Sequence, residues 1–560
     1  MARKRRTPVD RRIRLLLSLF VALFAVLLAR SAWLQGVRAE SLSRLAAKQH
    51  RETLVLPAAR GTIFDRNGDV LAIGEQATTV YADLQEVRRP RAVVLAAERT
   101  LGIDGNALYN ELLDRKRSFV YVDRKADPAK AARLEKRHLQ GLGFYAEERR
   151  TYPAGVAAHV LGYAGVDNRG LAGLELQLDH TLAGRPGSET IVKDPFGRVI
   201  DVLAERPERE GHDVFLTLDH TIQANAETVL RQTVAKWHAR SGTAIVLDPH
   251  TGDVLAMAVA PTFDANRFAD TPPDLTRNRA VTDVYEPGST FKLITVAGVL
   301  SDKLVTPTTA FVLPYSIHVA DKVIHDAEPR STETMSVARI LAQSSNVGAV
   351  TLAERLGRDR LYRWIRRFGF GNVTRVGFPG ESRGFLLAPD RWYGSSIGNI
   401  PIGQGVAVTP IQMAAAYATV ANGGKWVQPH LVDHVEGHRR THVRSRRVIS
   451  RTVTAELNAM LQNVVTEGTG TNAAVPGYKV AGKTGTAQKP DASGGYSSNH
   501  YVASFVGMVP ASRPRLVILV TVDEPQGAIW GGVVAAPAFA RIASYDLQYL
   551  EVPPDNPSHP

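Results

Sequence analysis

The strongest hydrophobic pattern in the chain is a run of apolar residues near the N-terminus, at positions 15–29. Arg30 interrupts the run, which then resumes through three more apolar residues that include Trp33. An arginine near a helix end can extend toward lipid headgroups, and tryptophan favours the membrane interface, so the apolar length reaches about 20 residues and can cross a bilayer once. We predict a basic cytoplasmic tail at residues 1–14 and a transmembrane anchor at residues 15–35.

A cleaved signal peptide has an apolar core of similar length and is the alternative to an uncleaved anchor. Either one carries the rest of the chain out of the cytoplasm. Residues 1–50 hold eleven basic and two acidic residues, which is +9 of the total net charge of +13. A basic cluster directly before an apolar run marks the cytoplasmic side of a membrane. Because the excess is concentrated there and no nucleic-acid-binding motif accompanies it, we expect no nucleic acid partner.

Behind the anchor the pattern becomes that of a folded α+β protein. Residues 41–56 have helical and then extended character, and helical spacing recurs at 93–101 and 131–139. Short apolar runs around proline- and glycine-containing turns predict two pairs of antiparallel strands, and so a central antiparallel sheet flanked by helices. The predicted strands are 243–248, 254–259, 504–509 and 516–523.

A charged, proline-containing segment at 206–211 marks the expected domain boundary, just before an apolar strand at 213–218. We therefore predict a first, β-rich domain at residues 36–210 and a second domain at 211–550. The last segment, 551–560, is rich in proline and is expected to be a flexible tail.

Composition adds two constraints. The chain has 560 residues, of which 44% are hydrophobic and 22% charged, as is usual for folded domains. It contains no cysteine, so disulfides, thiol nucleophiles and cysteine-based metal sites are excluded. His434, His438 and His442 recur every four residues, a spacing that would suit a metal on a helix. Gly437 and the basic run at 444–447 favour an exposed hairpin or loop instead, and we expect no metal.

Three short motifs carry the candidate chemistry. They are Ser289-Thr290-Phe291-Lys292, Ser344-Ser345-Asn346 and Lys483-Thr484-Gly485-Thr486. Each alone is common by chance, as a helix start, a turn or the edge of a strand. In this order, and with these flanks, they assemble a penicillin-reactive serine acyltransferase site.

The residue types fit nucleophilic catalysis. A serine hydroxyl needs a neighbouring base to become a good nucleophile at neutral pH. The segment 286–288, Glu-Pro-Gly, predicts a helix start before Ser289, and residues i and i+3 share a helix face, so Lys292 can reach the hydroxyl. Burial beside a second cation, Lys483, would favour the neutral form that a base requires. The backbone N–H of Ser289 is the expected source of one oxyanion contact.

Together with the segments that flank the three motifs, the chain resembles the class B penicillin-binding proteins, most closely the FtsI-type D,D-transpeptidases that cross-link septal peptidoglycan. The resemblance covers nearly the whole chain and separates it from a β-lactamase. The segments that carry it are 282–292, 343–348, 403–405 with 409–410, 60–68, 152–153, 159–162 and 170–175. It implies a membrane-anchored, β-rich pedestal domain of the class B dimerisation type, followed by a transpeptidase domain with a serine β-lactamase-like fold.

The resemblance also implies the role of each site residue. Ser289 is the expected nucleophile and Lys292 its base, with Ser344 as proton relay and Asn346 as partner of a substrate amide. The lysine motif, Lys483, Thr484, Gly485 and Thr486, is expected to bind the substrate carboxylate, with Thr486 N–H as second oxyanion donor. The implied reaction attacks the carbonyl between two D-alanines of a stem peptide, releases D-Ala and transfers the acyl group to an amine. No metal or organic cofactor is required.

Implied partners are peptidoglycan stem peptides, lipid-linked nascent glycan, β-lactams as covalent inhibitors, the membrane, a polytopic FtsW-like glycan polymerase and other division proteins. The implied place is the plasma membrane at the division septum, with the catalytic domain outside. Tyr496, His500 and Tyr501 are candidates for controlling the openness of the groove.

Several alternatives stay open at this point. An elongation-type transpeptidase and a D,D-carboxypeptidase share the same site. A non-enzymatic penicillin sensor or scaffold is a further alternative, although all three motifs are intact and no signalling domain is recognised. A class A β-lactamase is not supported, because Thr454 stands where its deacylating glutamate would be in the segment 454–458.

Overall fold

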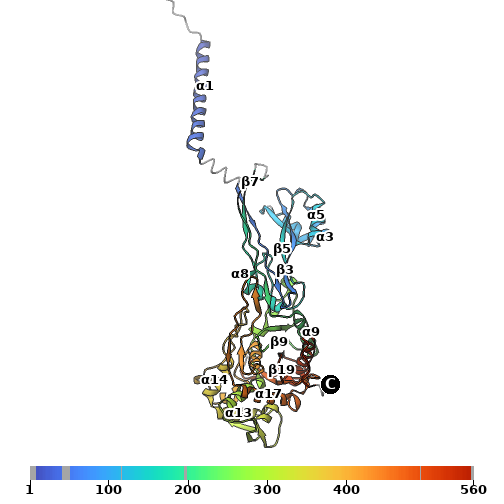
Figure 1. Ribbon diagram of the computed structural model, residues 1–560. Helices are drawn as coiled ribbons and strands as arrows, with labels where there is room; N and C mark the ends of the chain where they lie inside the picture. Colours follow the sequence, from blue (N-terminus) through green and yellow to red (C-terminus); the bar gives the residue numbers. More distant parts are fainter. Residues whose placement is uncertain (1–7, 41–50, 115, 194–198, 492–493, 557–560) are drawn as a thin grey trace, which may run out of the picture. The chain divides into compact units, whose positions relative to one another are not determined.

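The computed structural model describes residues 8–40, 51–114, 116–193, 199–491 and 494–556 (Figure 1). It divides into two units: Met1–Ala58 with Gly184–Glu210, and Ala59–Ala183 with Gly211–Pro560. Residues 36–58 and 184–210 of the predicted first domain lie in the first unit, and residues 59–183 lie in the second unit with the predicted second domain.

The first unit contains the predicted anchor. Helix α1 (Pro8–Ala32) continues as the π-helical η1 (Trp33–Val37), and the stretch Arg11–Val37 is long and apolar enough to cross a membrane. The guanidinium groups of Arg30 and Arg38 lie 5.6 and 4.7 Å from the centroid of the Trp33 ring. This pairing of cations with an aromatic ring is typical of the end of a membrane helix.

A three-stranded antiparallel sheet completes this unit. Its order is β1 (Arg51–Leu56), β6 (Gly187–Lys193) and β7 (Val199–Arg206). Strand β1 is the extended part of the predicted 41–56 segment. The helical part, residues 41–50, lies outside the described residues.

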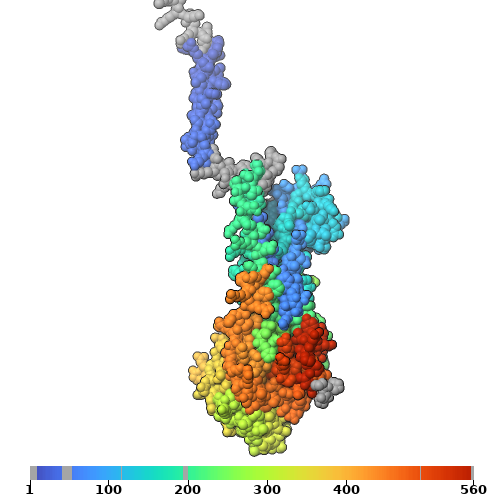
Figure 2. All heavy atoms as spheres, in the orientation of Figure 1, coloured from blue at the N-terminus to red at the C-terminus, as the bar shows by residue number. Residues whose placement is uncertain are grey.

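In the second unit, residues 70–151 form what we call the head subdomain, the blue-to-cyan region of Figure 2. Its sheet contains β3 (Val70–Asp83), β4 (Phe119–Ala126) and β5 (Leu142–Thr151). One face of the sheet packs on α3 (Pro90–Leu101), α4 (Gly105–Leu112) and α5 (Pro128–Glu135) through a buried core that includes Val80, Val93 and Leu134. The predicted helix at 131–139 ends early, because His138 adopts a left-handed backbone at φ 49°.

Strand β3 also joins a sheet whose order is β16 (Val432–Val435), β8 (Val214–Leu216), β2 (Ile63–Phe64), β3 and β4. Short helices follow β5, namely α6 (Ala158–Leu161), α7 (Gly173–Gln177) and α8 (Asp179–Leu182). His434 lies in β16, and no residue from 436 to 444 is helical, so the histidine repeat runs from a strand into a loop, in agreement with the second of the two predicted forms, hairpin or loop.

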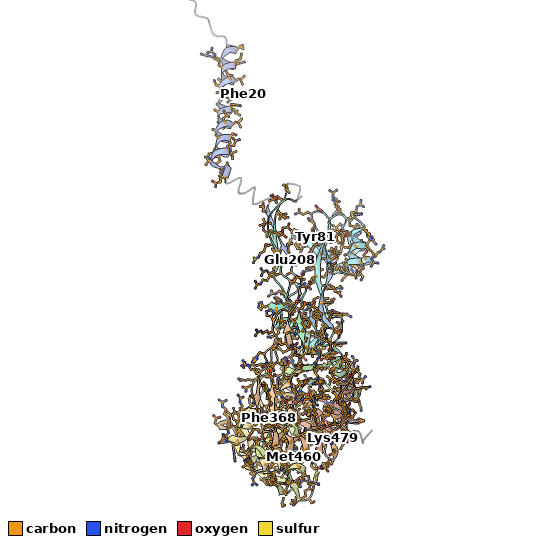
Figure 3. All side chains as sticks on the ribbon, viewed as in Figure 1. Phe20, Tyr81, Glu208, Phe368, Met460 and Lys479 are labelled. Carbon is orange, nitrogen blue, oxygen red and sulfur yellow. The ribbon has the colours of Figure 1, made fainter. Side chains whose placement is uncertain are left out.

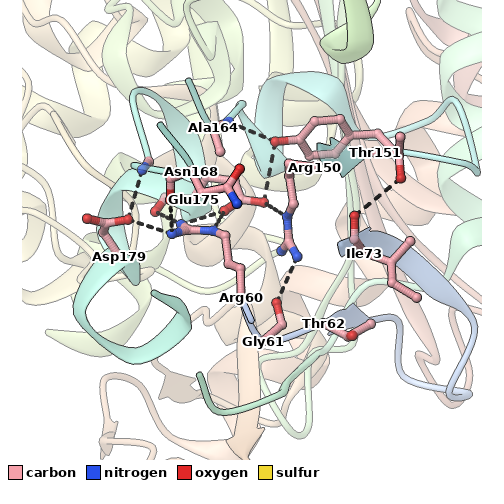
Figure 4. Close-up of polar contacts among 12 residues, drawn as sticks. Arg60, Gly61, Thr62, Ile73, Arg150, Thr151, Ala164, Asn168, Glu175 and Asp179 are labelled. Carbon is pink, nitrogen blue, oxygen red and sulfur yellow. Dashed lines mark hydrogen bonds and ion pairs between the residues drawn. The ribbon is translucent and has the colours of Figure 1, made fainter. Parts of the chain in front are cut away.

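A buried ion network fixes these segments together (Figure 4). Glu175 is fully buried and pairs with Arg60 and Arg150, each at 2.6 Å. Arg60 also pairs with Asp179 at 2.7 Å, and Arg150 donates to the carbonyl of Gly61. Arg60, which begins the segment 60–68, is therefore joined to Glu175, which ends the segment 170–175, by a buried charge pair.

The central sheet of the second unit has five antiparallel strands in the order β10-β9-β20-β19-β18. Their bounds are β9 (Ser241–Leu247), β10 (Val254–Ala260), β18 (Ala481–Pro490), β19 (Tyr496–Val509) and β20 (Leu516–Asp523). All four predicted strands are confirmed, although β19 begins eight residues before the predicted start at 504. The predicted α+β class, with a central antiparallel sheet flanked by helices, is also confirmed.

Helices cover both faces of this sheet. In β20, Val517 and Leu519 belong to one core with α11 (Lys292–Ser301), α16 (Pro410–Ala421) and α17 (Arg451–Thr466). Ile518 and Val520 belong to the other core, with α9 (His220–Lys236) and α19 (Ala536–Tyr549). Because alternate side chains enter opposite cores, β20 is apolar at nearly every position.

The remaining elements surround the cleft and the outer surface. They are α10 (Arg279–Thr282), α12 (Val337–Ala342), α13 (Asn346–Leu356), α14 (Arg358–Phe368), α15 (Ser396–Asn399), α18 (Gly531–Val534), β11 (Ala310–Leu313), β12 (Ser316–Val319), β13 (Lys322–His325), β14 (Glu333–Ser336), β15 (Lys425–Val427) and β17 (Ser445–Arg447). Figure 3 shows the side chains of this region, with Phe368 and Met460 as labelled core residues. In the C-terminal segment, Asp555 accepts from the backbone N–H of Lys479 at 2.7 Å, which fixes this part of the chain.

Candidate active site

Ser289 lies in η4 (Gly288–Phe291), a 3₁₀ turn directly before α11. The sequence predicted the first turn of an α-helix here, so the helix start is corrected to a tighter turn. In a 3₁₀ turn, residues i and i+3 are eclipsed, which places Ser289 and Lys292 one above the other. The backbone N–H of Lys292 donates to the carbonyl of Ser289 and closes the turn.

Two contacts fix this turn from outside. Gly288 has φ +55° and donates its N–H to the carbonyl of Gly403 at 3.1 Å. The buried hydroxyl of Tyr417 donates to the carbonyl of Thr290 at 2.9 Å. The geometry of the nucleophile turn therefore depends on α16 and on the 403–405 loop, which lies between the second and third motifs in the sequence.

Lys292 is 1% exposed, and its Nζ is the centre of the site. It donates to Asn346 Oδ1 at 2.8 Å and to Ser344 Oγ at 3.2 Å, and it also contacts the carbonyl oxygen of Ser344. Burial lowers the pKa of Lys292 to about 7, against the opposing charge of Asp326. Near neutral pH a large fraction of this amine is therefore unprotonated and can accept a proton.

The second motif owes its shape to Asp326, which the sequence analysis missed. Ser344 has a left-handed backbone at φ 59°, and Ser345 caps the N-terminus of α13. Asp326 accepts from the backbone N–H of Asn346 at 2.6 Å and from Ser345 Oγ at 3.0 Å. It also pairs with Arg330 at 2.6 Å. No motif marks Asp326 in the sequence, because its partners are brought to it only by folding.

The third motif lies on β18, the edge strand of the central sheet. Lys483 is fully buried, and its Nζ contacts Thr484 Oγ1 at 3.2 Å. Thr484 Oγ1 lies 2.6 Å from the hydroxyl of Thr469, and Thr486 Oγ1 accepts from the N–H of Gly531 at 3.1 Å. Burial, and then the neighbouring Lys292, lower the pKa of Lys483. Thr469 and Gly531 are further site neighbours that the sequence did not mark.

Glycines let the third motif approach the first. A Cβ added at Gly485 would lie 2.3 Å from Ser504 Oγ and 2.9 Å from the carbonyl of Pro287. A Cβ at Gly288 would meet the carbonyl of Thr486 at 3.0 Å. The Lys-Thr-Gly strand therefore lies directly against the nucleophile turn, and the contacts of Lys292 with Ser344 and Asn346 bring the second motif to the same site.

Glu286 forms a junction beside the nucleophile turn. Its Oε1 accepts from the N–H of Gly405 at 2.8 Å and from the hydroxyl of Tyr496 at 3.3 Å, while burial raises its pKa. Tyr496 thus connects the β18–β19 hairpin to the segment 282–292, which contains Ser289. His500 and Tyr501, the other candidate groove residues, contact Ser497 and Gln488 within the hairpin itself.

Among the described residues, Asp65, Asp69 and His220 form a group with the spacing of metal ligands. Asp65 already accepts backbone N–H groups of Asn67 at 2.7 Å and Asp69 at 2.9 Å, as in an ordinary turn. The group joins the turn at Asp65–Asp69 to His220 at the start of α9 and includes no residue of the three motifs.

Comparisons with known proteins agree with this geometry. Residues 242–544 match the family model described as the penicillin binding protein transpeptidase domain, and residues 55–216 match the penicillin-binding protein dimerisation domain. The chain is 34% identical over 560 residues to the peptidoglycan D,D-transpeptidase FtsI of Escherichia coli K12, covering 97% of this chain and 92% of that protein. It is 34% identical over 557 residues to the probable peptidoglycan D,D-transpeptidase PenA of Neisseria gonorrhoeae, covering 98% and 94%.

Among solved structures, the chain is similar to penicillin binding protein 3 of Mycobacterium tuberculosis in complex with aztreonam. The TM-score is 0.71 with 31% identity, and the match covers 90% of this chain and 99% of that one. Both halves of the chain therefore have counterparts in the same relatives.

Proposed function

Because the chain belongs to the class B penicillin-binding proteins of the FtsI type, we propose that it is a serine D,D-transpeptidase that cross-links the stem peptides of peptidoglycan. The observation that carries the proposal is the buried Lys292, with a pKa lowered to about 7, beside Ser344 and Asn346 and one turn from Ser289.

In the proposed acylation, Ser289 Oγ attacks the carbonyl carbon between the two terminal D-alanines. The proton of the hydroxyl passes to neutral Lys292, either directly or through Ser344 Oγ, which contacts Nζ at 3.2 Å. The C–N bond then breaks, and the proton goes to the leaving D-Ala amine. Backbone N–H groups of Ser289 and Thr486 are the proposed donors to the oxyanion.

In the proposed second half, an amine of a neighbouring stem peptide attacks the ester carbonyl. Its proton passes to Lys292, a new amide forms, and Ser289 is released with its proton restored. Asn346 is the proposed partner of a substrate amide, although its Oδ1 is also the acceptor of Lys292 at 2.8 Å. Substrate binding and the proton state of the base would therefore be coupled through this one side chain.

The third motif is the proposed site of the substrate carboxylate. Lys483 is fully buried, and among the described residues its Nζ makes hydrogen bonds only to Thr484, so an incoming carboxylate would supply its counter-charge. The hydroxyls of Thr484 and Thr486 would donate to the same anion. β-Lactams, which carry a carboxylate beside a reactive amide, would acylate Ser289 in the same way.

For the cellular setting, we propose a single-pass protein whose N-terminus is cytoplasmic and whose catalytic domain lies outside. The helix Arg11–Val37 supports an anchor, and the basic residues 1–14 support this orientation. A septal role beside an FtsW-like polymerase is proposed from the likeness to FtsI. The family matches at 55–216 and 242–544 support the proposed pedestal at 36–210 and transpeptidase domain at 211–550.

The decisive experiment labels the full-length protein in detergent with a fluorescent penicillin, followed by intact mass measurement. We expect one stable adduct that is absent from Ser289→Ala and retained in the control Ser118→Ala, whose serine is exposed in the head subdomain.

A second experiment measures the products that the penicillin-labelled enzyme and the free enzyme form from stem pentapeptides, with and without an acceptor amine. Cross-linked product supports transpeptidation, whereas hydrolysis alone would indicate a carboxypeptidase.

A further inference from the structure

The head subdomain presents one uncovered face of its sheet, opposite the helices. Among the described residues of β3, β4 and β5, the large apolar side chains that are exposed are all aromatic: Phe119 is 47% exposed, Tyr121 42% and Tyr145 40%. Tyr81, labelled in Figure 3, pairs with Tyr121 across β3 and β4. Exposed aromatic clusters of this kind usually mark a binding surface.

The rings of this aromatic face are arranged against one another rather than scattered. The centroids of Tyr81 and Tyr145 are 6.0 Å apart, and those of Phe119 and Tyr121 are 5.2 Å apart. A Cβ at Gly143 would lie 2.2 Å from the Tyr81 ring, so this ring lies across β5 where a glycine leaves room for it. The phenol rings thus offer flat apolar surfaces edged with hydroxyl groups.

The aromatic face continues along β5 into a basic pocket. Tyr145, Glu147 and Arg149 are alternate residues of β5 and so lie on the same face of the sheet. The guanidinium group of Arg124 lies 5.1 Å from the centroid of the Tyr121 ring and pairs with Glu147 at 2.9 Å. Both Arg124 and Arg149 line a pocket of about 520 Å³.

Positive charge dominates the wall of this pocket. Its charged lining residues are Arg124, Lys125, Arg149, Arg150 and Glu75. The donors are not all used: Arg124 Nε, Arg149 Nε and Arg150 Nη2 are buried without a hydrogen-bond partner among the described residues. Buried donors without acceptors are costly, so an anion in this pocket would stabilise the guanidinium groups around it.

We propose that the aromatic face and the basic pocket together bind a strand of peptidoglycan, with sugar rings on the tyrosines and stem-peptide carboxylates in the pocket. Tyr145 and Arg149 are four residues apart on one strand, which is about 13 Å, or roughly one disaccharide with its peptide arm. The choice of this glycan rests on the proposed function. The site itself is separate from the Ser289 cleft and would hold substrate or product strands beside the enzyme.

The occupant follows from the chemistry of both parts of the surface. Pyranose rings have an apolar C–H face and a rim of hydroxyls, which match the faces and hydroxyls of tyrosine. The pocket arginines already pair with carboxylates of the chain, but a protein partner that buried the aromatic face would leave their unused N–H donors without acceptors unless it also supplied acidic residues. Peptidoglycan supplies sugar rings and carboxylates on one polymer.

The test uses full-length protein whose Ser289 has first been acylated with penicillin, which blocks the catalytic cleft. Titration calorimetry measures binding of a muramyl tetrasaccharide that carries stem peptides, and of chitotetraose, which has sugars but no carboxylates. We expect both to bind the acylated protein, the muramyl probe more tightly. Tyr121→Ala with Tyr145→Ala should weaken both by about tenfold, whereas Arg149→Gln should weaken only the muramyl probe, by about three- to tenfold.

Matched controls are Tyr393→Ala, an exposed tyrosine outside the head subdomain, and Arg439→Gln in an exposed loop. Tyr145→Phe keeps the ring and should bind within about twofold of the wild type. Each variant must still be acylated by penicillin, which shows that it is folded. Unchanged binding in the aromatic and arginine variants, or no binding to acylated protein, would overturn the inference and leave a protein as the occupant of this face. Glycan binding without any penicillin acylation would instead contradict the proposed function alone.

Discussion

Lys292 Nζ lies 2.8 Å from Oδ1 of Asn346, and this contact joins the first motif to the second. The same nitrogen contacts two oxygen atoms of Ser344. An ammonium has three donors and can satisfy all three acceptors, whereas a neutral amine has two donors and one lone pair. Deprotonation therefore frees one contact, and Ser344 Oγ can turn to donate to the amine.

The rate of acylation should depend on pH through Lys292. Burial lowers the pKa of Lys292 to about 7, so the neutral fraction rises with pH. Between pH 6 and pH 8 we expect the acylation rate with penicillin to rise by about tenfold. Asn346→Asp places a negative charge beside the ammonium and should move the midpoint upward by about one pH unit. Stopped-flow fluorescence from pH 5.5 to 9 measures the acylation rate of the wild type and of Asn346→Asp. A wild-type rate that does not change with pH would exclude Lys292 as the titrating base.

Lys292 should also lower the stability of the fold. Its pKa in the folded protein is about 7, below the usual value of about 10.4 in an unfolded chain. Between these values the unfolded chain binds more protons, so stability rises with pH from about 7 to 10. Lys292→Met should raise the free energy of unfolding at pH 7 by about 1 kcal/mol or more, with a smaller gain near pH 10.

Thermal and urea unfolding at pH 7 and pH 10 measure the stability of Lys292→Met. This variant should also lose penicillin labelling. Lys479→Met, which replaces an exposed lysine, is the control and should leave stability unchanged within about 0.5 kcal/mol. Equal effects of the two substitutions would mean that burial of Lys292 carries no electrostatic cost.

Asp326 should be essential for the shape of the second motif. Asp326→Asn removes the charge that pairs with Arg330 at 2.6 Å and weakens the acceptor for Asn346 N–H. We expect the acylation rate to fall at least tenfold and stability to fall by about 3 kcal/mol. The pH midpoint should move downward, because Asp326 raises the pKa of Lys292. Asp359→Asn, at an exposed position, is the control. An unchanged pH midpoint in Asp326→Asn would refute the claim that the charge of Asp326 raises the pKa of Lys292.

Gly403 should tolerate no side chain. Its φ is +82°, and an added Cβ would lie 2.1 Å from the carbonyl of Gly288, in the nucleophile turn. Gly403→Ala should reduce acylation more than tenfold, because either the turn or the 403–405 loop must move. Gly423 has φ +60° but no atom within 4 Å of its added Cβ. Gly423→Ala therefore carries the backbone cost of about 1 kcal/mol without the clash, and equal losses of acylation in both variants would contradict this explanation.

The buried network of Figure 4 should stabilise the pedestal without taking part in the chemistry. Glu175→Gln leaves Arg60 and Arg150 without their shared charge partner, and both side chains are at most 2% exposed. We expect the free energy of unfolding to fall by about 3 kcal/mol, with normal acylation at low temperature. Glu208→Gln, an exposed position labelled in Figure 3, is the control. Slow acylation in a fully folded Glu175→Gln protein would instead connect the network to the cleft.

The sequence by itself determined the elements that depend on local pattern and on chemistry. Apolar length identified the N-terminal helix that could cross a membrane. Apolar runs identified the strands at 243–248 and 516–523, because a sheet covered on both faces needs apolar residues at successive positions. The residue types at Ser289, Lys292 and Lys483 were informative because few reactions need a serine, two lysines and an asparagine in this order.

Only the tertiary structure decided which residues support that chemistry. Asp326 and Thr469 act through partners that are distant along the chain, and no local pattern marks such contacts. The same holds for the aromatic face, since Tyr81, Tyr121 and Tyr145 lie on three strands and meet only through their register. The motif allowed the direction of the pKa shift of Lys292 to be expected, but the burial that lowers this pKa, and the opposing charge of Asp326, are supplied only by the fold.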